Sequence, residues 1–299
     1  MPRRAGLLFV AFASLIALRH AAAEPFVVMS YNVENWLTTD RTIGSKHVPS
    51  APKPESEKNA VVEVIAAHKP DVLGVIEMGN RDDLDDLRAR LKKKGLDYPH
   101  VEWHQGLDTD RHVALLSRFP IVARNSQDHV PFNLNGQPQE IQRGILDATI
   151  EPEPGYQVRL IGLHLKSRRM VPDVDQEALR AKEAWFVHQY IEQILTKDPN
   201  TKLLLYGDLN TTKDEYPIRE ILGAYRTPSR LTDLSLADDQ GERWTHYYTT
   251  GDDYSRIDYL MVSPALKPDI DAKKSGVDRT PTWNEASDHR AIFTTIDPK

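Results

Sequence analysis

The amino-acid sequence predicts a mixed α/β protein, and three features support this prediction. Apolar runs of four to seven residues alternate with longer segments of helical periodicity, a rhythm typical of α/β domains. Several of these runs are apolar at every position, which indicates strands inside a sheet that is covered on both faces. No internal repeat or low-complexity linker divides the chain, so we expect a single domain.

The apolar runs predict ten strands. They span residues 26–30, 72–77, 113–116, 121–124, 145–150, 158–164, 202–206, 243–247, 257–262 and 291–296. Two long stretches lack this pattern. Residues 36–54 are predicted to form a surface loop, and residues 267–284 an irregular connection.

Three segments predict helices. Residues 56–68 have one apolar face, residues 81–94 are strongly charged, and residues 173–195 repeat apolar side chains with a period of 3.6 residues. The pair Pro172 and Asp173 marks the expected start of the last helix, where an aspartate can cap free backbone N–H groups.

The first residues resemble a targeting segment. Arg3 and Arg4 precede an uncharged apolar stretch over residues 7–18 and a run of alanines that ends at Ala23. This pattern predicts a secretory signal peptide over residues 1–23. The alternative is a membrane anchor, but the stretch is shorter than the ~20 residues that a spanning helix needs. We therefore expect a periplasmic or secreted protein with no stable membrane association after cleavage.

Residues 24–299 remain after cleavage, enough for one large domain to bury most of its apolar surface. The chain has no cysteine, which excludes a disulfide framework. Its formal net charge is −6, and loss of the three arginines in the signal segment makes it −9. This acidity argues against a broad basic face for nucleic acid. A polyanionic substrate stays compatible with it, because carboxylates that bind divalent cations reverse the local sign.

Polar residues border five of the predicted strands, where chemistry is often placed. They are Asn32 after residues 26–30, Glu77 after 72–76, His164 after 160–163, Gly207-Asp208-Leu209-Asn210 after 203–206, and Ser287-Asp288-His289-Arg290 before the last strand. Asp208 and Asn210 alternate past a strand end, so both side chains could face one phosphate-bound water. Gly-Asp-x-Asn is also ordinary turn chemistry, which is the alternative.

These residue types suit phosphodiester hydrolysis. The reaction needs a cation on the phosphate oxygens, a carboxylate to position or deprotonate water, and donors to the charge that develops. Hard cations such as Mg²⁺ prefer carboxylate and carboxamide oxygens. Asn32, Glu77 and Asp288 match that preference better than they match a zinc site, because the sequence has no HExxH motif and no cysteine cluster.

Simpler interpretations remain for some of these residues. Asp258 could be a buried structural acid paired with Arg256 or Arg290, and His164 could be a core histidine. The run from Lys166 to Arg169 could be a solvated loop, or it could contact flanking phosphates. Four tryptophans could stack on bases, although most tryptophans fill cores; they are Trp36, Trp103, Trp244 and Trp283.

Taken in order, the motifs resemble the endonuclease/exonuclease/phosphatase superfamily, the DNase-like group. They are Tyr31-Asn32-Val33, Glu77 after a strand, Leu163-His164-Leu165-Lys166-Ser167, Gly207-Asp208-Leu209-Asn210, Arg256-Ile257-Asp258-Tyr259 and Ser287-Asp288-His289. The resemblance implies a four-layered α/β sandwich, in which two mixed sheets pack face to face with helices outside. It places the site at one edge of the sheets.

The resemblance also implies roles. Glu77 would be the main metal ligand, with Asn32 and Asp288 close to the same cation or a second one. The cation would be Mg²⁺, with Mn²⁺ or Ca²⁺ as alternatives. Asp208 and Asn210 would orient the attacking water.

On the phosphate, the resemblance implies a contact from His289, with Asp258 as its orienting carboxylate. His164 would contact the scissile phosphate from the other side and is a candidate acid for the leaving oxygen, although the sequence offers it no clear acidic partner. Arg143, just before a strand, is similar to a phosphate-binding arginine of the family. Lys166 follows His164 and would also bind substrate.

The sequence therefore predicts an exported, divalent-metal-dependent phosphodiesterase, a nuclease that hydrolyses DNA or RNA by in-line attack of water. The alternative substrate is a phospholipid, a sphingolipid or a small phosphate ester. A protein that binds without catalysis is a third hypothesis, disfavoured because all the reacting groups are present. The sequence does not decide whether the substrate is DNA or RNA, whether the enzyme is an endonuclease or an exonuclease, or whether it binds one cation or two. No protein partner can be inferred from it.

Overall fold

The computed structural model describes residues 24–169 and 175–299. The expected signal peptide, residues 1–23, and the expected cap at Pro172 and Asp173 lie outside these ranges. Among the described residues, no helix has the length and apolar character to span a bilayer.

Two six-stranded sheets form the centre of the molecule. The first sheet has the order β17 (Ile270–Val277), β18 (Ile292–Ile296), β1 (Phe26–Trp36), β4 (Val72–Met78), β6 (His112–Ser117) and β5 (His100–His104). The second has the order β13 (Thr232–Asp233), β16 (Asp258–Val262), β12 (Leu203–Asp208), β11 (Tyr156–His164), β10 (Leu146–Glu153) and β7 (Ile121–Arg124). Each sheet mixes parallel and antiparallel pairs.

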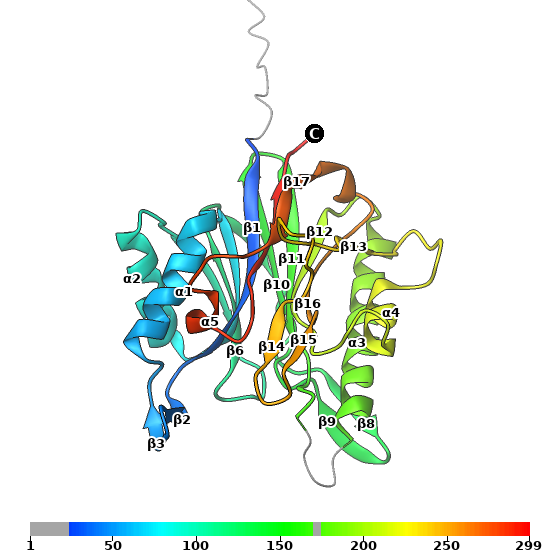
Figure 1. Cartoon of the computed structure of the whole chain (residues 1–299). Coiled ribbons are helices and arrows are strands. Elements are labelled where there is room, and N and C mark those ends of the chain that lie inside the picture. Colours follow the sequence, from blue (N-terminus) through cyan, green and yellow to red (C-terminus); the bar gives the residue numbers. More distant parts are fainter. Residues whose placement is uncertain (1–23, 170–174) are drawn as a thin grey trace, which may run out of the picture.

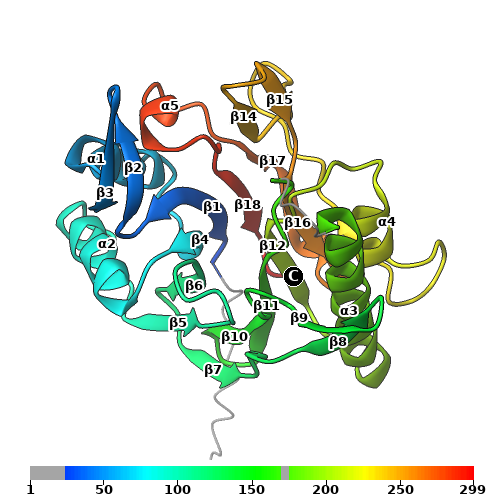
Figure 2. The ribbon, with the colours of Figure 1, turned by 90° about the horizontal axis from the view of Figure 1, so that it is seen from below.

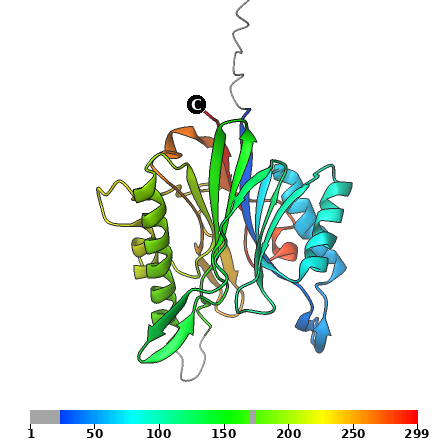
Figure 3. The ribbon, with the colours of Figure 1, turned by 180° about the vertical axis from the view of Figure 1, so that it is seen from behind.

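Helices cover the outer face of each sheet (Figures 1 and 3). On the first sheet lie α1 (Glu55–His68), α2 (Arg81–Lys93) and the short α5 (Trp283–Ala286); on the second lie α3 (Gln176–Lys197) and α4 (Tyr216–Leu222). The predicted fold class, two mixed sheets flanked by helices, is confirmed. The cap of α3 is Asp175, whose side chain accepts a hydrogen bond from the backbone N–H of Ala178.

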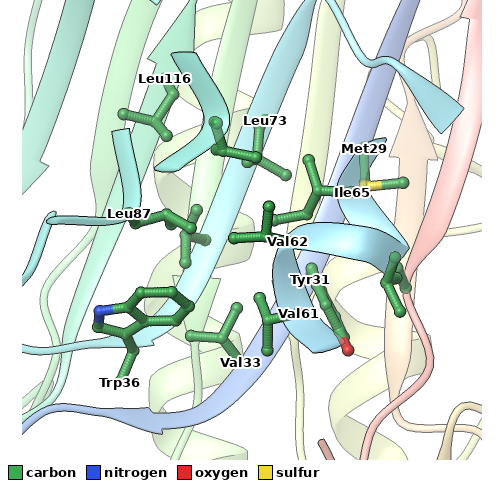
Figure 4. Packing of buried hydrophobic residues seen from close by; sticks show 14 of the residues in the cluster. Met29, Tyr31, Val33, Trp36, Val61, Val62, Ile65, Leu73, Leu87 and Leu116 are labelled. Atoms are coloured by element: carbon green, nitrogen blue, oxygen red, sulfur yellow. The ribbon is translucent and has the colours of Figure 1, made fainter. Parts of the chain in front are cut away.

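Three buried apolar clusters fill the spaces between these layers. One lies between α1, α2 and the first sheet (Figure 4), one between the two sheets, and one between the second sheet and the helices α3 and α4. Successive residues of a strand belong to different clusters: Val28 lies between the sheets and Met29 under α1. Central strands are apolar at every position because both of their faces are covered.

Two predictions about loops were wrong. Residues 36–54 contain a hairpin of β2 (Thr39–Ile43) and β3 (Lys46–Ala51), and residues 267–284 contain η1 (Lys267–Asp269), the edge strand β17 and the helix α5. These strands are largely exposed and polar, so they lack the apolar pattern used to predict strands. Two further hairpins are β8 (Pro131–Leu134) with β9 (Gln137–Glu140) and β14 (His246–Tyr248) with β15 (Asp253–Ser255).

Strand pairing places several polar residues at one edge of the sandwich. In the second sheet, His164 at the end of β11 pairs with Asp208 at the end of β12, and Asp208 pairs with Asp258 at the start of β16. In the first sheet, Asn32 of β1 pairs with Ile76, the residue before Glu77 in β4. Figure 2 is viewed from this edge, which is opposite the C-terminus in Figure 1.

Candidate active site

One carboxylate lies at the centre of the polar edge. Oδ2 of Asp208 accepts a hydrogen bond from Nδ2 of Asn32 at 3.1 Å. The same oxygen is 3.7 Å from Nε2 of His164 and 3.7 Å from Nε2 of His289. Nε2 of His164 is also 3.8 Å from Oε1 of Glu77. Side chains that are far apart in the sequence therefore converge on Asp208, from both sheets.

The turn after β12 holds Asp208 in place. Gly207 has φ +143°, and a Cβ there would lie 1.9 Å from the carbonyl oxygen of Leu163, so a side chain at this position would clash with β11. Asn210 is in the left-handed region at φ 50°, which asparagine tolerates better than most residues. Its backbone N–H donates to Oδ1 of Asp208 at 2.8 Å, and its Nδ2 donates to the carbonyl of Leu165 at 3.1 Å. The Gly207-Asp208-Leu209-Asn210 segment is therefore both a turn and a part of the site, and the two interpretations of this motif do not exclude each other.

His289 is held by a second carboxylate. Its Nδ1 is 2.8 Å from Oδ2 of Asp258, and both side chains are buried. Burial by itself would lower the pKa of His289, but the charges of Asp258 and Asp208 outweigh it and raise the pKa well above its usual range. Burial is also the main cause that raises the pKa of Asp208 to about 7, although His289 opposes the shift. His289 therefore stays charged at neutral pH, beside a carboxyl that can take up a proton.

His164 has the opposite character. Burial is the first cause that lowers its pKa well below the usual range, and the positive charge of Arg143 adds to the effect. Its Nδ1 is buried without a hydrogen-bond partner among the described residues. No acidic residue therefore orients His164 in the way that Asp258 orients His289.

Arg143 and Lys166 lie beside His164. Nε of Arg143 donates to Oδ2 of Asp108 at 2.9 Å, while its buried Nη1 finds no partner in the described part of the chain. The backbone N–H of Lys166 donates to Oε2 of the buried Glu183 at 2.7 Å, and Glu183 also accepts from the N–H of the residue before Arg143. Glu183 therefore ties the segments that carry Arg143 and Lys166 to α3.

Three further carboxylates, those of Glu34, Glu77 and Asp288, lie around this part of the site. The backbone N–H of Asp288 donates to Oε2 of Glu34 at 3.2 Å, and that of Asn35 donates to Oε2 of Glu77 at 3.0 Å. Burial, followed by the negative charge of Asp288, raises the pKa of Glu34 to about 7. Glu34 and Glu77 also have left-handed backbones, with φ 48° and 63°, a strain that is often stored at functional sites.

This cluster fits a divalent cation. Glu34, Glu77, Asp288 and Asn32 offer oxygen ligands, the type that hard cations such as Mg²⁺ prefer. A bound cation would offset both the burial and the negative charge of Asp288, which raise the pKa of Glu34. Among the described residues, two groups of three have ligand atoms within 4.8 Å of one another: His246, Asp288 and His289, and Asp208, Asp258 and His289. The oxygens of Glu34, Glu77 and Asp288 lie farther apart, so a cation would draw them together. The Nδ1 of His289 already contacts Asp258, so we prefer the all-oxygen set.

Three residues of the site were missed from the sequence. Glu34 lies two positions after Asn32, and that spacing was its signal. Glu183 is a charged residue on the apolar face of α3, four positions from both Leu179 and Val187, a pattern that marks a buried charge with a partner. Asp108, in a loop between β5 and β6, gave no signal.

Comparison with known proteins identifies the family. The sequence model of the endonuclease/exonuclease/phosphatase family matches residues 29–289. The chain belongs to this family. The predicted resemblance is thus confirmed, and the members of the endonuclease/exonuclease/phosphatase family are phosphoester hydrolases that generally depend on a divalent metal ion. The search of curated proteins found no match.

Solved structures show the same fold as this member of the endonuclease/exonuclease/phosphatase family. Truncated TDP2 of Caenorhabditis elegans has a TM-score of 0.61 at 21% identity, with 91% of this chain and 97% of that chain covered. The human Nocturnin catalytic domain with bound sulfate has a TM-score of 0.64 at 20% identity, with 92% and 95% covered. The 3′ phosphatase NExo from Neisseria, bound to a product DNA hairpin, has a TM-score of 0.61 at 20% identity, with 91% and 99% covered.

Proposed function

We propose that this protein is an exported, Mg²⁺-dependent phosphodiesterase that acts as a nuclease on DNA or RNA. The observation that carries this proposal is the position of Asp208, whose Oδ2 lies 3.7 Å from each of two histidines of opposite charge preference. A carboxylate cluster suited to a divalent cation adjoins it. A product-bound DNA phosphatase among the structural neighbours supports a nucleic-acid substrate. The N-terminal segment around Arg3 and Arg4 supports export.

In this mechanism Asp208 and Asn210 orient the attacking water. With a pKa of about 7, Asp208 can accept the proton that the water loses, because a general base works best when its pKa lies near the working pH. The backbone N–H of Asn210 donates to Oδ1 of Asp208, while the amide groups of Asn32 and Asn210 donate to Oδ2 and fix the direction in which the carboxylate faces the water.

His289 stabilises the charge that develops on the phosphate. Asp258 keeps its imidazole protonated and fixes its orientation, so Nε2 can donate a charged hydrogen bond to a non-bridging oxygen. His164 is neutral, so we assign it a hydrogen bond to the phosphate and no role as the acid. Arg143 and Lys166 would bind phosphate oxygens on that side.

Glu77, Glu34, Asp288 and Asn32 would hold the cation. When bound, it would neutralise phosphate oxygens and polarise the ester for attack. The chain's own groups then position the water and the phosphate around that charge.

Turnover assays test this proposal. The purified protein is incubated with plasmid DNA, RNA, a phospholipid panel and bis(4-nitrophenyl) phosphate, with Mg²⁺ or with a chelator, beside Asp208→Ala and His289→Ala. We expect Mg²⁺-dependent cleavage of a nucleic acid and of the small diester, and a loss of about 10²–10⁴-fold in each variant. The exposed residues Asp82 and His47 supply the matched controls Asp82→Ala and His47→Ala.

Two outcomes would contradict the proposal. Activity that survives both site substitutions would mean that the chemistry lies elsewhere. Cleavage of a phospholipid or small ester with DNA and RNA intact would replace the nuclease by the alternative phosphoesterase.

A further inference from the structure

A large cleft opens beside the candidate active site. Its volume is about 1190 Å³, and Asn210 and Asp288 belong to its lining, so it is continuous with the catalytic groups. Residues that follow β11 and β12 line one side, and the β14–β15 hairpin lines another. The volume exceeds the ~300–1,000 Å³ of a small-molecule pocket. The cleft therefore suits a short segment of a polymer better than one small ester.

Aromatic side chains form the hairpin wall of this cleft. Tyr248 and Tyr254 keep 55% and 52% of their surface exposed, although large aromatic residues are usually covered in a folded domain. Tyr254 stacks on Tyr247 with the ring centroids 4.5 Å apart and meets Trp244 edge-on at 4.8 Å. Tyr254 is thus pre-oriented by neighbouring rings while about half of its surface stays open. Tyr248, the residue after Tyr247 in β14, lines the same cleft.

The wall is fixed to the catalytic segment. His246 pairs with His289 in an antiparallel bridge, and the N–H of Tyr247 donates to the carbonyl of Asp288 at 2.9 Å. The guanidinium of the buried Arg290 lies 4.2 Å from the Trp244 ring centre. Because residues 288–290 carry both the site and these contacts, the aromatic surface has a fixed position relative to the scissile phosphate.

The cleft is also more basic than the rest of the chain. Five lysines and arginines and three aspartates line it, whereas the whole chain has a formal charge of −6. Arg256 and Arg168 form ion pairs with Asp233 and Glu215. Arg243 has no ion pair within the described ranges 24–169 and 175–299, so its charge is available to a ligand.

We propose that this cleft binds the unpaired nucleotides on one side of the scissile phosphate. Their bases stack on Tyr248 and Tyr254, and their phosphates approach Arg243. The inference rests on the proposed function and narrows its substrate to single-stranded DNA or RNA. Bases can stack on a protein ring only when they have left their own duplex stack, and phosphate contacts alone would not require exposed aromatic faces.

Paired substrates test the inference. Steady-state cleavage is measured on a single-stranded oligonucleotide, on the same sequence as a duplex, on an abasic strand of equal length and on bis(4-nitrophenyl) phosphate. The variants are Tyr248→Ala/Tyr254→Ala, the matching Phe double substitution, which keeps the rings, and Tyr225→Ala, which removes an exposed tyrosine that does not line the cleft.

For the wild type, we expect the single strand to be cleaved faster than the duplex. The alanine pair should lower kcat/KM on the single strand by roughly 5- to 150-fold for each stacked base lost. The abasic strand and the small diester should change by less than about twofold, and the Phe pair and Tyr225→Ala should resemble the wild type on every substrate.

Four results would overturn the inference. Full activity of the alanine pair on the single strand would show that bases do not stack on Tyr248 and Tyr254. An equal loss on all substrates, the abasic strand and the small diester included, would show that the tyrosines support the site itself and do not stack on bases. A wild-type enzyme that cleaves the small diester but no single strand would refute nucleotide binding in the cleft, while the phosphodiesterase assignment would stand. A protein that cleaves no diester at all would contradict both proposals.

Discussion

The two histidines of the site lie at the same distance from Asp208, with 3.7 Å between Nε2 and Oδ2 in each case, yet their environments differ. His289 has Asp258 on its second nitrogen, and its pKa is raised. His164 has no partner on its second nitrogen among the described residues, and burial together with Arg143 lowers its pKa. Both rings are almost completely buried. Burial alone therefore does not set the charge; the neighbour of the far nitrogen does.

This contrast suits a phosphodiester that lies between the two rings. A charged donor faces it on the His289 side. On the His164 side, the positive charge belongs to Arg143 and Lys166 and the imidazole is neutral. Two imidazolium ions this close to each other would each destabilise the other. With His289 charged and His164 neutral, both rings can face the phosphate without that repulsion.

The largest expected difference is between two alanine substitutions. His289→Ala removes a charged hydrogen-bond donor and should lower kcat/KM by about 10²–10⁴-fold. His164→Ala removes a neutral donor while Arg143 stays, and should cost roughly tenfold. Both are measured on bis(4-nitrophenyl) phosphate at pH 7 with saturating Mg²⁺. Equal losses of kcat/KM would mean that the two histidines stabilise the transition state to the same extent.

A smaller effect is expected from Asp258→Asn. The carboxylate raises the pKa of His289, so its removal should lower that pKa and move the alkaline limb of the pH profile of kcat/KM to lower pH. We expect a loss of about 10- to 100-fold at pH 8 that becomes smaller as the pH falls towards 6. A loss of the same size at every pH would show that Asp258 only positions the ring.

The His289 side was easier to predict from the sequence than the His164 side. Asn32, Asp208, Asp258 and His289 lie in short motifs at strand ends, and strand pairing brings such ends together. The partners of the His164 side come from places without such a rule. Glu183 lies in the middle of a helix and Asp108 in a loop, and only tertiary packing places them beside Arg143.

The same distinction applies to the fold. Strands buried on both faces, such as β4 and β12, were predicted because burial requires an apolar residue at every position. The hairpins β2–β3 and β14–β15 carry polar or aromatic residues and lie outside the two six-stranded sheets, so their turns and the neighbouring loops determine their conformation. The aromatic wall of the cleft could not be predicted from the sequence for this reason. Tyr248 and Tyr254 lie on opposite strands of a hairpin that lacks the alternation of apolar and polar residues.

The two histidines should also affect stability in opposite directions with pH. His164 has a lowered pKa in the folded state, so its stabilising effect is present above the unfolded value near 6.5 and is lost as the pH falls below it. His289 has a raised pKa, so its effect is complete below about 6.5 and is lost only as the pH rises through its folded value.

Denaturant unfolding of wild type and His164→Gln between pH 7.5 and 5 tests the first half of this statement. The wild type should lose stability relative to the variant as the pH falls, with a limiting slope of about 1.4 kcal/mol per pH unit for one proton. Parallel curves would show that folding does not lower the pKa of His164. The buried His104, whose pKa burial also lowers, contributes equally to both proteins and cancels in the difference.

The smallest effect is expected at Glu183, which acts on the His164 side only through the backbone. In Glu183→Gln a single amide oxygen replaces two carboxylate oxygens. It should keep the shorter bond, 2.7 Å from the N–H of Lys166, and lose the longer one, 3.4 Å from the N–H of Gln142. The buried N–H of Gln142 then lacks an acceptor, which costs about 1 kcal/mol of stability. The adjacent Arg143 becomes less well positioned, so KM should rise about threefold to tenfold while kcat changes little. A fall in kcat at constant KM would instead mean that Glu183 holds the reacting groups themselves.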